Sequence, residues 1–249
     1  PILLGIVGIF FFFFLFFVGE HIWILFSFLF GLGCLLFAYL SYEQFVFLVD
    51  YIDRGPDSAK VVALVKELVE TKGAIALKGN HEDMLKEFLE DPIFNAEHYL
   101  LQGGYQTMLS YGYKGMDADY LAEKFNEEHG ETRIFLENLP FYYETADYIF
   151  VHAGVNLYLQ DWHDSNSVDF LWIREQFHRA MNLTGKRIVF GHTPTCHLNA
   201  NKSFNPWENQ DRNKLGIDGG ICHPGGKLWG IRFKEGGIIH AAYFVDTRL

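Results

Sequence analysis

Four short apolar runs in this chain each end at a polar residue of a type that binds metal ions. The runs are typical of β-strands because they are brief, rich in strand-forming residues and followed by turns. They lead to Asp50, Asn80, His152 and His192. In α/β proteins, sites form beyond the carboxyl ends of the strands, so these side chains are predicted to converge. One carboxylate, one amide oxygen and two imidazoles suit a divalent ion such as Mn, Fe or Zn.

Each of the four residues has a simpler explanation when it is considered alone. An aspartate is common in turns, an asparagine in loops, and a histidine often caps a strand without binding metal. Four such residues in the same structural position favour a metal site over four coincidences.

The remaining pattern predicts a single α/β domain over residues 1–249, with no repeat and no linker. The expected strands are Phe45–Val49, Ala74–Leu77, Tyr148–Val151, Arg187–Phe190 and Leu215–Ile217, with a final hairpin of Lys227–Phe233 and Gly237–Val245. The expected helices are Ser58–Lys72, which Gly73 ends, and Glu82–Glu90. Residues 91–140 are expected to be mostly helical, broken at Gly103–Gly104, and to form a cap inserted over one face.

Composition narrows the class of partner. The formal net charge of −11 argues against nucleic acid, whose phosphates bind lysine and arginine. Cys34, Cys196 and Cys222 are scattered and form no CxxC pair, so we expect a reduced, cytoplasmic setting. The oligomeric state is left open.

Residues 1–40 are anomalous because they contain eleven of the 25 phenylalanines and a single charge, Glu20. By length they could be read as two membrane spans, but the basic flanks that orient such spans are missing. A second interpretation makes Phe11–Val18 a buried strand and Trp23–Phe37 a helix of the soluble fold. A third is that the written sequence of this stretch is itself in error. We expect the strand and helix, and therefore no membrane anchor.

Several segments, in this order, resemble motifs of the phosphoprotein phosphatase family within the calcineurin-like metallophosphoesterases, closest to the serine/threonine phosphatases of bacteria and phages. Residues 50–55 resemble GDxxDRG, residues 79–82 GNHE, residues 152–154 HAG and residues 191–193 GHT. Residues 172–174 resemble the W-x-R element, residues 102–107 the NGG-x-x-T segment, and residues 217–220 a late strand of the bacterial members.

The resemblance implies a β-sandwich of mixed sheets, flanked by helices, that holds two divalent metal ions. Manganese is expected, with iron, zinc or magnesium as alternatives. Asp50 would bridge both ions, and Asn80, His152 and His192 would complete the shell of the second. A hydroxide bridging the ions would attack the phosphorus atom in line.

The resemblance also assigns the catalytic side chains. Arg54 and Arg174 would bind the phosphoryl oxygens, for which planar guanidinium groups are well shaped. His81 would protonate the leaving oxygen, and Asp53 would orient its imidazole. A surface ion pair is the usual role of a lone arginine, but it is a poor explanation for two arginines inside these motifs.

Two departures concern the metal centre. Val49 stands where the family has glycine, and the first metal-binding motif, GDxHG, is absent. Gly19-Glu20-His21 stands at the matching distance, so we expect it to form the metal loop and place Glu20 near Asp50.

Three functions follow from these observations. The leading one is hydrolysis of a phosphomonoester, on phosphoserine or phosphothreonine of a protein or peptide, with a small phosphoester as the other possible substrate. The second is symmetrical cleavage of diadenosine tetraphosphate, which the core motifs do not distinguish from the first. The third is a non-catalytic binding module, against which the presence of Arg54, His81 and Arg174 argues.

Overall fold

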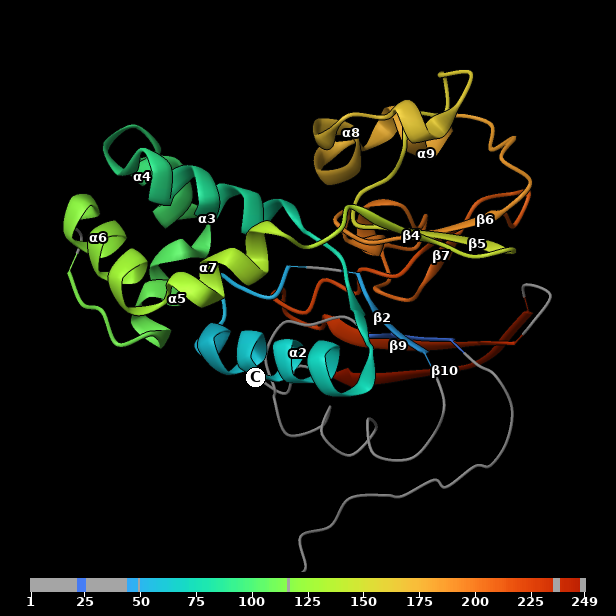
Figure 1. Cartoon of the computed structure of the whole chain (residues 1–249). Helices are drawn as coiled ribbons and strands as arrows, with labels where there is room; N and C mark the ends of the chain where they lie inside the picture. The colour runs from blue at the N-terminus through green and yellow to red at the C-terminus, as the bar shows by residue number, and fades with distance from the viewer. Residues whose placement is uncertain (1–21, 26–43, 49, 116, 235–237, 247–249) are drawn as a thin grey trace, which may run out of the picture.

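The computed structural model describes residues 22–25, 44–48, 50–115, 117–234 and 238–246. Within these ranges the strands form two five-stranded sheets. Figure 1 shows the sheets stacked against each other, with one group of helices beside them and further helices on their outer faces.

The first sheet has the strand order β10-β9-β1-β2-β3. Its strands are β1 (Ile22–Leu25), β2 (Gln44–Phe47), β3 (Ile75–Ala76), β9 (Lys227–Lys234) and β10 (Ile238–Asp246). The first three strands along the chain are parallel to one another, and the final hairpin joins them antiparallel through β9. This sheet is therefore mixed, as predicted.

The second sheet has the order β4-β5-β6-β8-β7. Its strands are β4 (Tyr142–Glu144), β5 (Tyr148–Val151), β6 (Arg187–Phe190), β7 (Trp207–Glu208) and β8 (Lys214–Gly216). Strands β5, β6 and β8 are parallel, and the two edge strands are antiparallel to their neighbours. Two of the predicted strands, β5 and β6, have the predicted bounds.

The helices are α2 (Ser58–Lys72), α3 (Asn80–Glu90), α4 (Pro92–Tyr99), α5 (Tyr105–Ser110), α6 (Ala118–Glu128), α7 (Gly130–Glu137), α8 (Ser167–Trp172) and α9 (Glu175–Arg179). Short turns of other helix types are η1 (Leu100–Gly104), η2 (Trp162–Asp164) and η3 (Thr195–His197). Helix α2 ends where expected, at Gly73, whose φ of 66° is one that glycine adopts without strain.

Alternation along the strands explains the layers. On β2, Phe45 and Phe47 pack in one apolar cluster with α2, whereas Val46 packs in another that lies between the sheets. On β5, Phe150 joins the cluster between the sheets and Ile149 joins a third cluster with α8 and α9. Because successive strand side chains point to opposite faces, both faces of these strands are covered.

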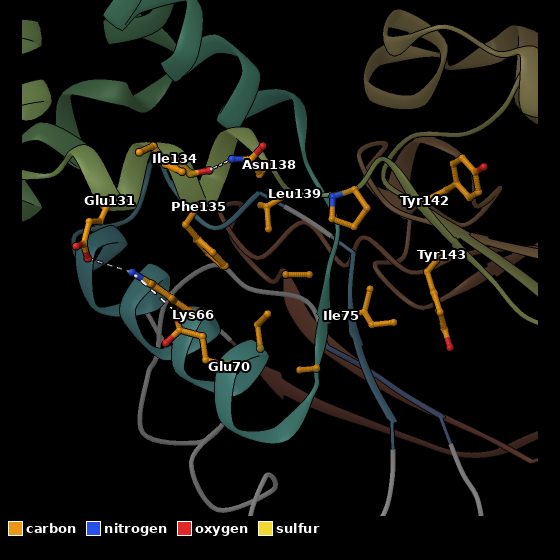
Figure 2. Close-up of a pocket in the computed structure, with 14 residues that line it drawn as sticks. Lys66, Glu70, Ile75, Glu131, Ile134, Phe135, Asn138, Leu139, Tyr142 and Tyr143 are labelled. Carbon is orange, nitrogen blue, oxygen red and sulfur yellow. Dashed lines mark hydrogen bonds and ion pairs between the residues drawn. The ribbon is translucent and has the colours of Figure 1, made fainter.

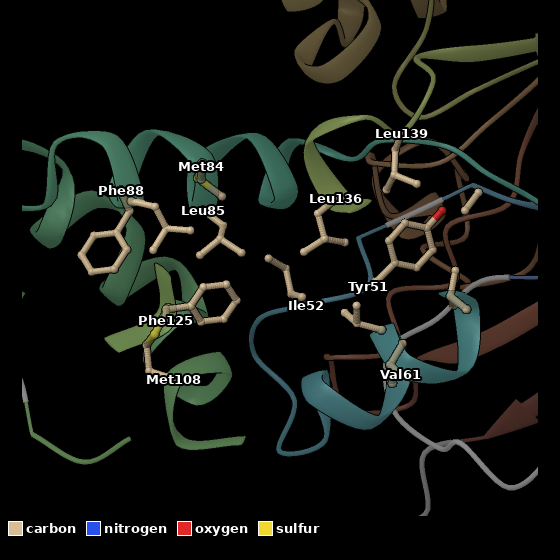
Figure 3. Close-up of a cluster of buried hydrophobic side chains, with 14 of the residues drawn as sticks. Tyr51, Ile52, Val61, Met84, Leu85, Phe88, Met108, Phe125, Leu136 and Leu139 are labelled. Atoms are coloured by element: carbon tan, nitrogen blue, oxygen red, sulfur yellow. The ribbon is translucent and has the colours of Figure 1, made fainter. Parts of the chain in front are cut away.

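Residues 91–140 are mostly helical, as predicted, and they pack in the same apolar cluster as α2 and one face of β2 (Figure 3). Phe88 of α3, Met108 of α5 and Phe125 of α6 are fully buried there, together with Leu136 of α7. The same cluster extends to Ile52, which lies in the loop after β2. The helical region is therefore packed directly onto the loop that carries several of the candidate site residues.

One sequence prediction is wrong. Trp23–Leu25 was expected at the start of a helix, but these residues belong to β1, which pairs with β2 and β9 in the middle of the first sheet. A continuous apolar run has no periodicity that distinguishes a buried strand from a buried helix. The predicted strand Phe11–Val18 and the metal loop with Glu20 lie outside the described residues. In the described part of the chain, no helix has the length and apolar character needed to span a bilayer.

Candidate metal centre

The four strand-end residues come together, as their positions at the ends of the strands predict. Oδ1 of Asn80 lies 2.9 Å from Nε2 of His152 and 2.9 Å from Nδ1 of His192, and the two nitrogens are 3.3 Å apart. Oδ1 of Asp50 lies 3.7 Å from Nε2 of His152. All four side chains are buried.

Both sheets contribute to this cluster. Asp50 follows β2 and Asn80 opens α3 just after β3, so these two come from the first sheet. His152 follows β5 and His192 follows β6 of the second sheet. The cluster therefore lies where the carboxyl ends of the parallel strands of both sheets meet, and it depends on how the sheets are packed together.

Three of the four donor atoms are spaced as ligands of one divalent cation would be. Around a metal with bonds of about 2.1 Å, neighbouring ligand atoms lie about 3.0–3.4 Å apart. The separations of 2.9, 2.9 and 3.3 Å among Asn80, His152 and His192 are close to that range. Among the described residues, no group of three or more His, Cys, Asp and Glu side chains is arranged as a metal site, so the candidate set includes the amide oxygen of Asn80.

The electrostatics of the cluster also suit a cation. Burial lowers the pKa of His152, and burial together with the charges of His152 and Arg174 places the pKa of His192 well below its usual value. Both rings are therefore neutral near pH 7, the form that binds metal. Burial by itself raises the pKa of Asp50, but its interactions with the three neighbouring histidines, together with a hydrogen bond from the backbone N–H of His81, lower it by more, so the net shift is downward.

His81 and Asp53 form a buried pair next to the cluster. Nδ1 of His81 lies 2.6 Å from Oδ2 of Asp53. The other oxygen of Asp53 accepts hydrogen bonds from Oγ1 of Thr107 at 2.7 Å and from the hydroxyl of Tyr99 at 3.1 Å. Burial lowers the pKa of His81, but Asp50 and Asp53 raise it by more, so the net shift is upward. A proton on this ring is therefore favoured.

Arg54 is held by the helical region. Its backbone N–H donates to the carbonyl of Gly103 at 3.1 Å, and its Nε donates to the carbonyl of Gln102 at 3.4 Å. A guanidinium N–H points to Sγ of Cys222 at 3.7 Å. Asp53, Arg54 and His192 have φ values of 71°, 63° and 60°. Strained backbone of this kind in non-glycine residues clusters at functional sites.

Arg174, at the start of α9, is close enough for its charge to lower the pKa of both His152 and His192. Its charge also interacts with Asp218. Burial and the charge of Asp50 raise the pKa of Asp218 to about 6, although a hydrogen bond from the backbone N–H of Gly220 and the charges of Arg54 and Arg174 lower it. The eight residues predicted from the sequence are thus grouped in one region of the molecule.

Sequence reasoning assigned no role to Asp218, Tyr99 or Glu82. Asp218 follows β8 just as the other candidates follow their strands, so the strand-end rule could have found it. Glu82 is buried, and its carboxylate accepts from two backbone N–H groups of the site loops. Tyr99 gave no local signal, because its contact with Asp53 joins residues 46 positions apart.

A cavity of about 710 Å³ lies elsewhere, between α2, α7, β3 and β4 (Figure 2). Its lining includes Phe135, Leu139 and Tyr143, with Lys66 and Glu131 at one side. None of the candidate site residues contributes to this lining. The cavity therefore gives no support to an active site at this position, and the chemistry points to the strand-end cluster.

Comparisons with known proteins show what the chain is similar to. Residues 36–225 match the family model of calcineurin-like phosphoesterases. The chain is 27% identical over 219 residues to an asymmetrical bis(5'-nucleosyl)-tetraphosphatase, PrpE, of Oceanobacillus iheyensis, covering 80% of this chain and 78% of that protein.

Solved structures show the same fold at low sequence identity. A protein assigned as a diadenosine tetraphosphatase is 18% identical with a TM-score of 0.60, covering 91% of this chain and 94% of that one. A metallophosphoesterase from Sphaerobacter thermophilus is 15% identical with a TM-score of 0.53, covering 92% and 89%. A serine/threonine phosphatase from Saccharomyces cerevisiae is 14% identical with a TM-score of 0.50, covering 91% and 80%.

Proposed function

Because the chain belongs to the calcineurin-like phosphoesterase family, we propose that the strand-end cluster is the metal centre of a phosphoester hydrolase. The observation that carries this proposal is the triangle of Asn80 Oδ1, His152 Nε2 and His192 Nδ1, with Asp50 beside it. The buried His81–Asp53 pair adjoins that triangle and gives it a proton donor. A binding module without catalysis has no use for such a pair.

Each side chain has a role in this scheme. Asp50, Asn80, His152 and His192 hold divalent metal, which supplies Lewis acidity and lowers the pKa of water. Arg54 and Arg174 bind and orient the phosphoryl oxygens with planar guanidinium groups. His81, oriented through Nδ1 by Asp53, delivers a proton to the leaving oxygen from the other side of its ring.

Two substrate classes remain, and we propose dinucleoside tetraphosphates as the first. The support is the resemblance to the tetraphosphatase of Oceanobacillus iheyensis, which extends over most of both chains. An exposed tryptophan, Trp172, also lies with its ring centroid 5.8 Å from that of His192, where a nucleobase could stack. The second candidate is a phosphoserine or phosphothreonine protein, which the GNHE-like and GHTP-like segments at residues 79–82 and 191–194 favour.

Parallel assays on one preparation test both candidates. Metal-stripped protein is loaded with Mn, Fe, Zn or Mg and is then given either diadenosine tetraphosphate or a phosphoserine peptide. The control is the stripped protein in excess chelator. Asymmetrical cleavage of the dinucleotide yields ATP and AMP, and symmetrical cleavage yields two molecules of ADP. We expect metal-dependent cleavage of the dinucleotide.

Asp50→Asn should lower metal content and activity together, whereas Asp119→Asn, an exposed aspartate on α6, should change neither. Full activity of the stripped protein in chelator would contradict the metal-dependent scheme. Exclusive release of phosphate from the peptide would move the assignment to the protein phosphatases, and failure on both substrates with metal bound would favour a binding module.

A further inference from the structure

Glu82 is a buried carboxylate that connects two loops of the metal centre. Its side chain is 2% exposed. Oε1 accepts a hydrogen bond from the backbone N–H of Tyr51 at 2.7 Å, and Oε2 accepts one from the backbone N–H of Gly79 at 2.8 Å. Tyr51 directly follows Asp50, and Gly79 directly precedes Asn80. The two oxygens of Glu82 are thus bound next to two of the candidate metal ligands.

The connection is reciprocal. Oδ1 of Asp50 accepts a hydrogen bond from the backbone N–H of His81 at 3.1 Å, while Glu82 accepts from the backbone N–H of Tyr51. Two consecutive residues of the loop therefore pair with two consecutive residues at the start of α3. In each pair, a side-chain carboxyl oxygen from one segment accepts from a backbone N–H of the other. Both bonds join residues 31 positions apart and fix the separation of the two loops.

There is little space for these loops to shift. Gly79 lies against the side chains of Asp50 and Glu82, and a Cβ atom at this position would collide with a carboxylate oxygen of each. Because both carboxyl groups lie so close to Gly79, we expect a change in the Glu82 side chain to displace the loops that carry Asp50 and Asn80.

The geometry requires two acceptors at the end of this side chain. A glutamine at position 82 has nearly the same shape but presents one oxygen and one NH₂ group. Whichever way it turns, one of the N–H groups of Tyr51 and Gly79 faces another donor. An aspartate keeps both acceptors but is one methylene shorter, so it cannot reach both loops.

We propose that Glu82 is a positioning residue of the metal centre, which holds Asp50 and Asn80 at the separation that metal binding requires by joining their loops. This inference rests on the proposed function, since it concerns the same metal centre. Groups that orient metal ligands without binding the metal themselves affect metal affinity, and their loss lowers that affinity by about 10–100-fold.

The test compares Glu82→Gln with Glu87→Gln, which alters an exposed glutamate on the same helix. The Mn²⁺ dissociation constant of each metal-stripped protein is measured by titration calorimetry, and thermal unfolding shows how much of the protein is folded. We expect Glu82→Gln to weaken Mn²⁺ binding by about 10–100-fold and to change the absorption spectrum of the Co²⁺-loaded protein. Glu87→Gln should bind Mn²⁺ as the wild type does, and Glu82→Asp should fall between the two.

A folded Glu82→Gln variant with wild-type Mn²⁺ affinity and an unchanged Co²⁺ spectrum would overturn the inference, even if its melting temperature fell, because the role would then be structural alone. If neither position-82 variant folds, the residue is needed for folding and the positioning role is withdrawn. Wild-type protein that binds Mn²⁺ but cleaves neither substrate contradicts the proposed function, while the comparison of affinities still decides the role of Glu82. Wild-type protein that binds neither Mn²⁺ nor Zn²⁺ would overturn both.

Discussion

Nδ1 of His81 lies 2.6 Å from Oδ2 of Asp53, and both side chains are almost completely buried beside the strand-end cluster. The carboxylate fixes one edge of the imidazole ring and favours its protonated form. The second oxygen of Asp53 is held in turn by Thr107 and Tyr99 of the helical region. The orientation of the proton donor therefore depends on residues far away in the sequence.

Replacing His81 with asparagine should lower turnover by about 10²–10⁴-fold, the usual contribution of general acid catalysis. Metal content should stay at the wild-type level, because the proposed ligands are intact. Turnover is measured at saturating substrate, and the metal content of each protein is measured by elemental analysis. His98→Asn, which alters an exposed histidine of α4, is the matched control. Unchanged turnover in His81→Asn would remove this residue from the mechanism.

Gly103→Ala should weaken substrate binding through Arg54. Gly103 has a φ of 114°, and a Cβ atom there would come within 2.5 Å of the backbone nitrogen of Arg54. Gly112 has a φ of 92° with nothing within 4 Å of its Cβ position, so Gly112→Ala carries the backbone strain without the collision. Strain alone costs each variant about 1–2 kcal/mol of stability.

Only Gly103→Ala is expected to raise KM, because only that change displaces the arginine that binds phosphoryl oxygens. The measurement is steady-state kinetics combined with denaturant unfolding of both variants. Equal KM values for the two variants would show that the contact between Gly103 and Arg54 has no part in substrate binding.

Trp172→Ala should raise KM for diadenosine tetraphosphate by roughly 5–150-fold, the equivalent of about 1–3 kcal/mol for one stacked base. KM for a small phosphomonoester without a base should not change. Phe94→Ala, at an aromatic residue of α4 that is 83% exposed, controls for the loss of surface aromatic area. The same rise in KM for both substrates would refute base stacking at Trp172.

The pH dependence of stability should include a contribution from His163, away from the metal centre. Nε2 of this ring lies 2.9 Å from Glu144, and Nδ1 lies 2.6 Å from Asp161. These hydrogen bonds raise the pKa of His163. A raised pKa in the folded state means that the stabilisation is fully present below the unfolded value of about 6.5 and is lost as the pH rises through the folded value.

The difference in unfolding free energy between wild type and His163→Asn should therefore be larger at pH 5.5 than at pH 9. Urea unfolding at both pH values measures it, with His98→Asn as the control. A difference that is the same at both values, or larger at pH 9, would contradict an ionised His163 in this network.

The sequence by itself determined the local elements and the residues at their ends. Strands β5 and β6 and helix α2 have the bounds that their patterns predicted, because short runs of strand-forming residues and helical spacing are local properties. Asp50, Asn80, His152 and His192 followed from the rule that sites form at the carboxyl ends of parallel strands. The choice between strand and helix at Trp23–Leu25 did not follow, because a continuous apolar run has no period.

Only the tertiary structure decided how these ends are held together. Asn80 meets His192 across 112 positions of sequence, and Asp53 meets Thr107 across 54. The role of Glu82 depends on two backbone N–H groups that look like any others in the sequence. Such partners are set by the packing of the sheets and the helical region against one another, which places donors and acceptors within 3 Å of each other. No local pattern carries that information.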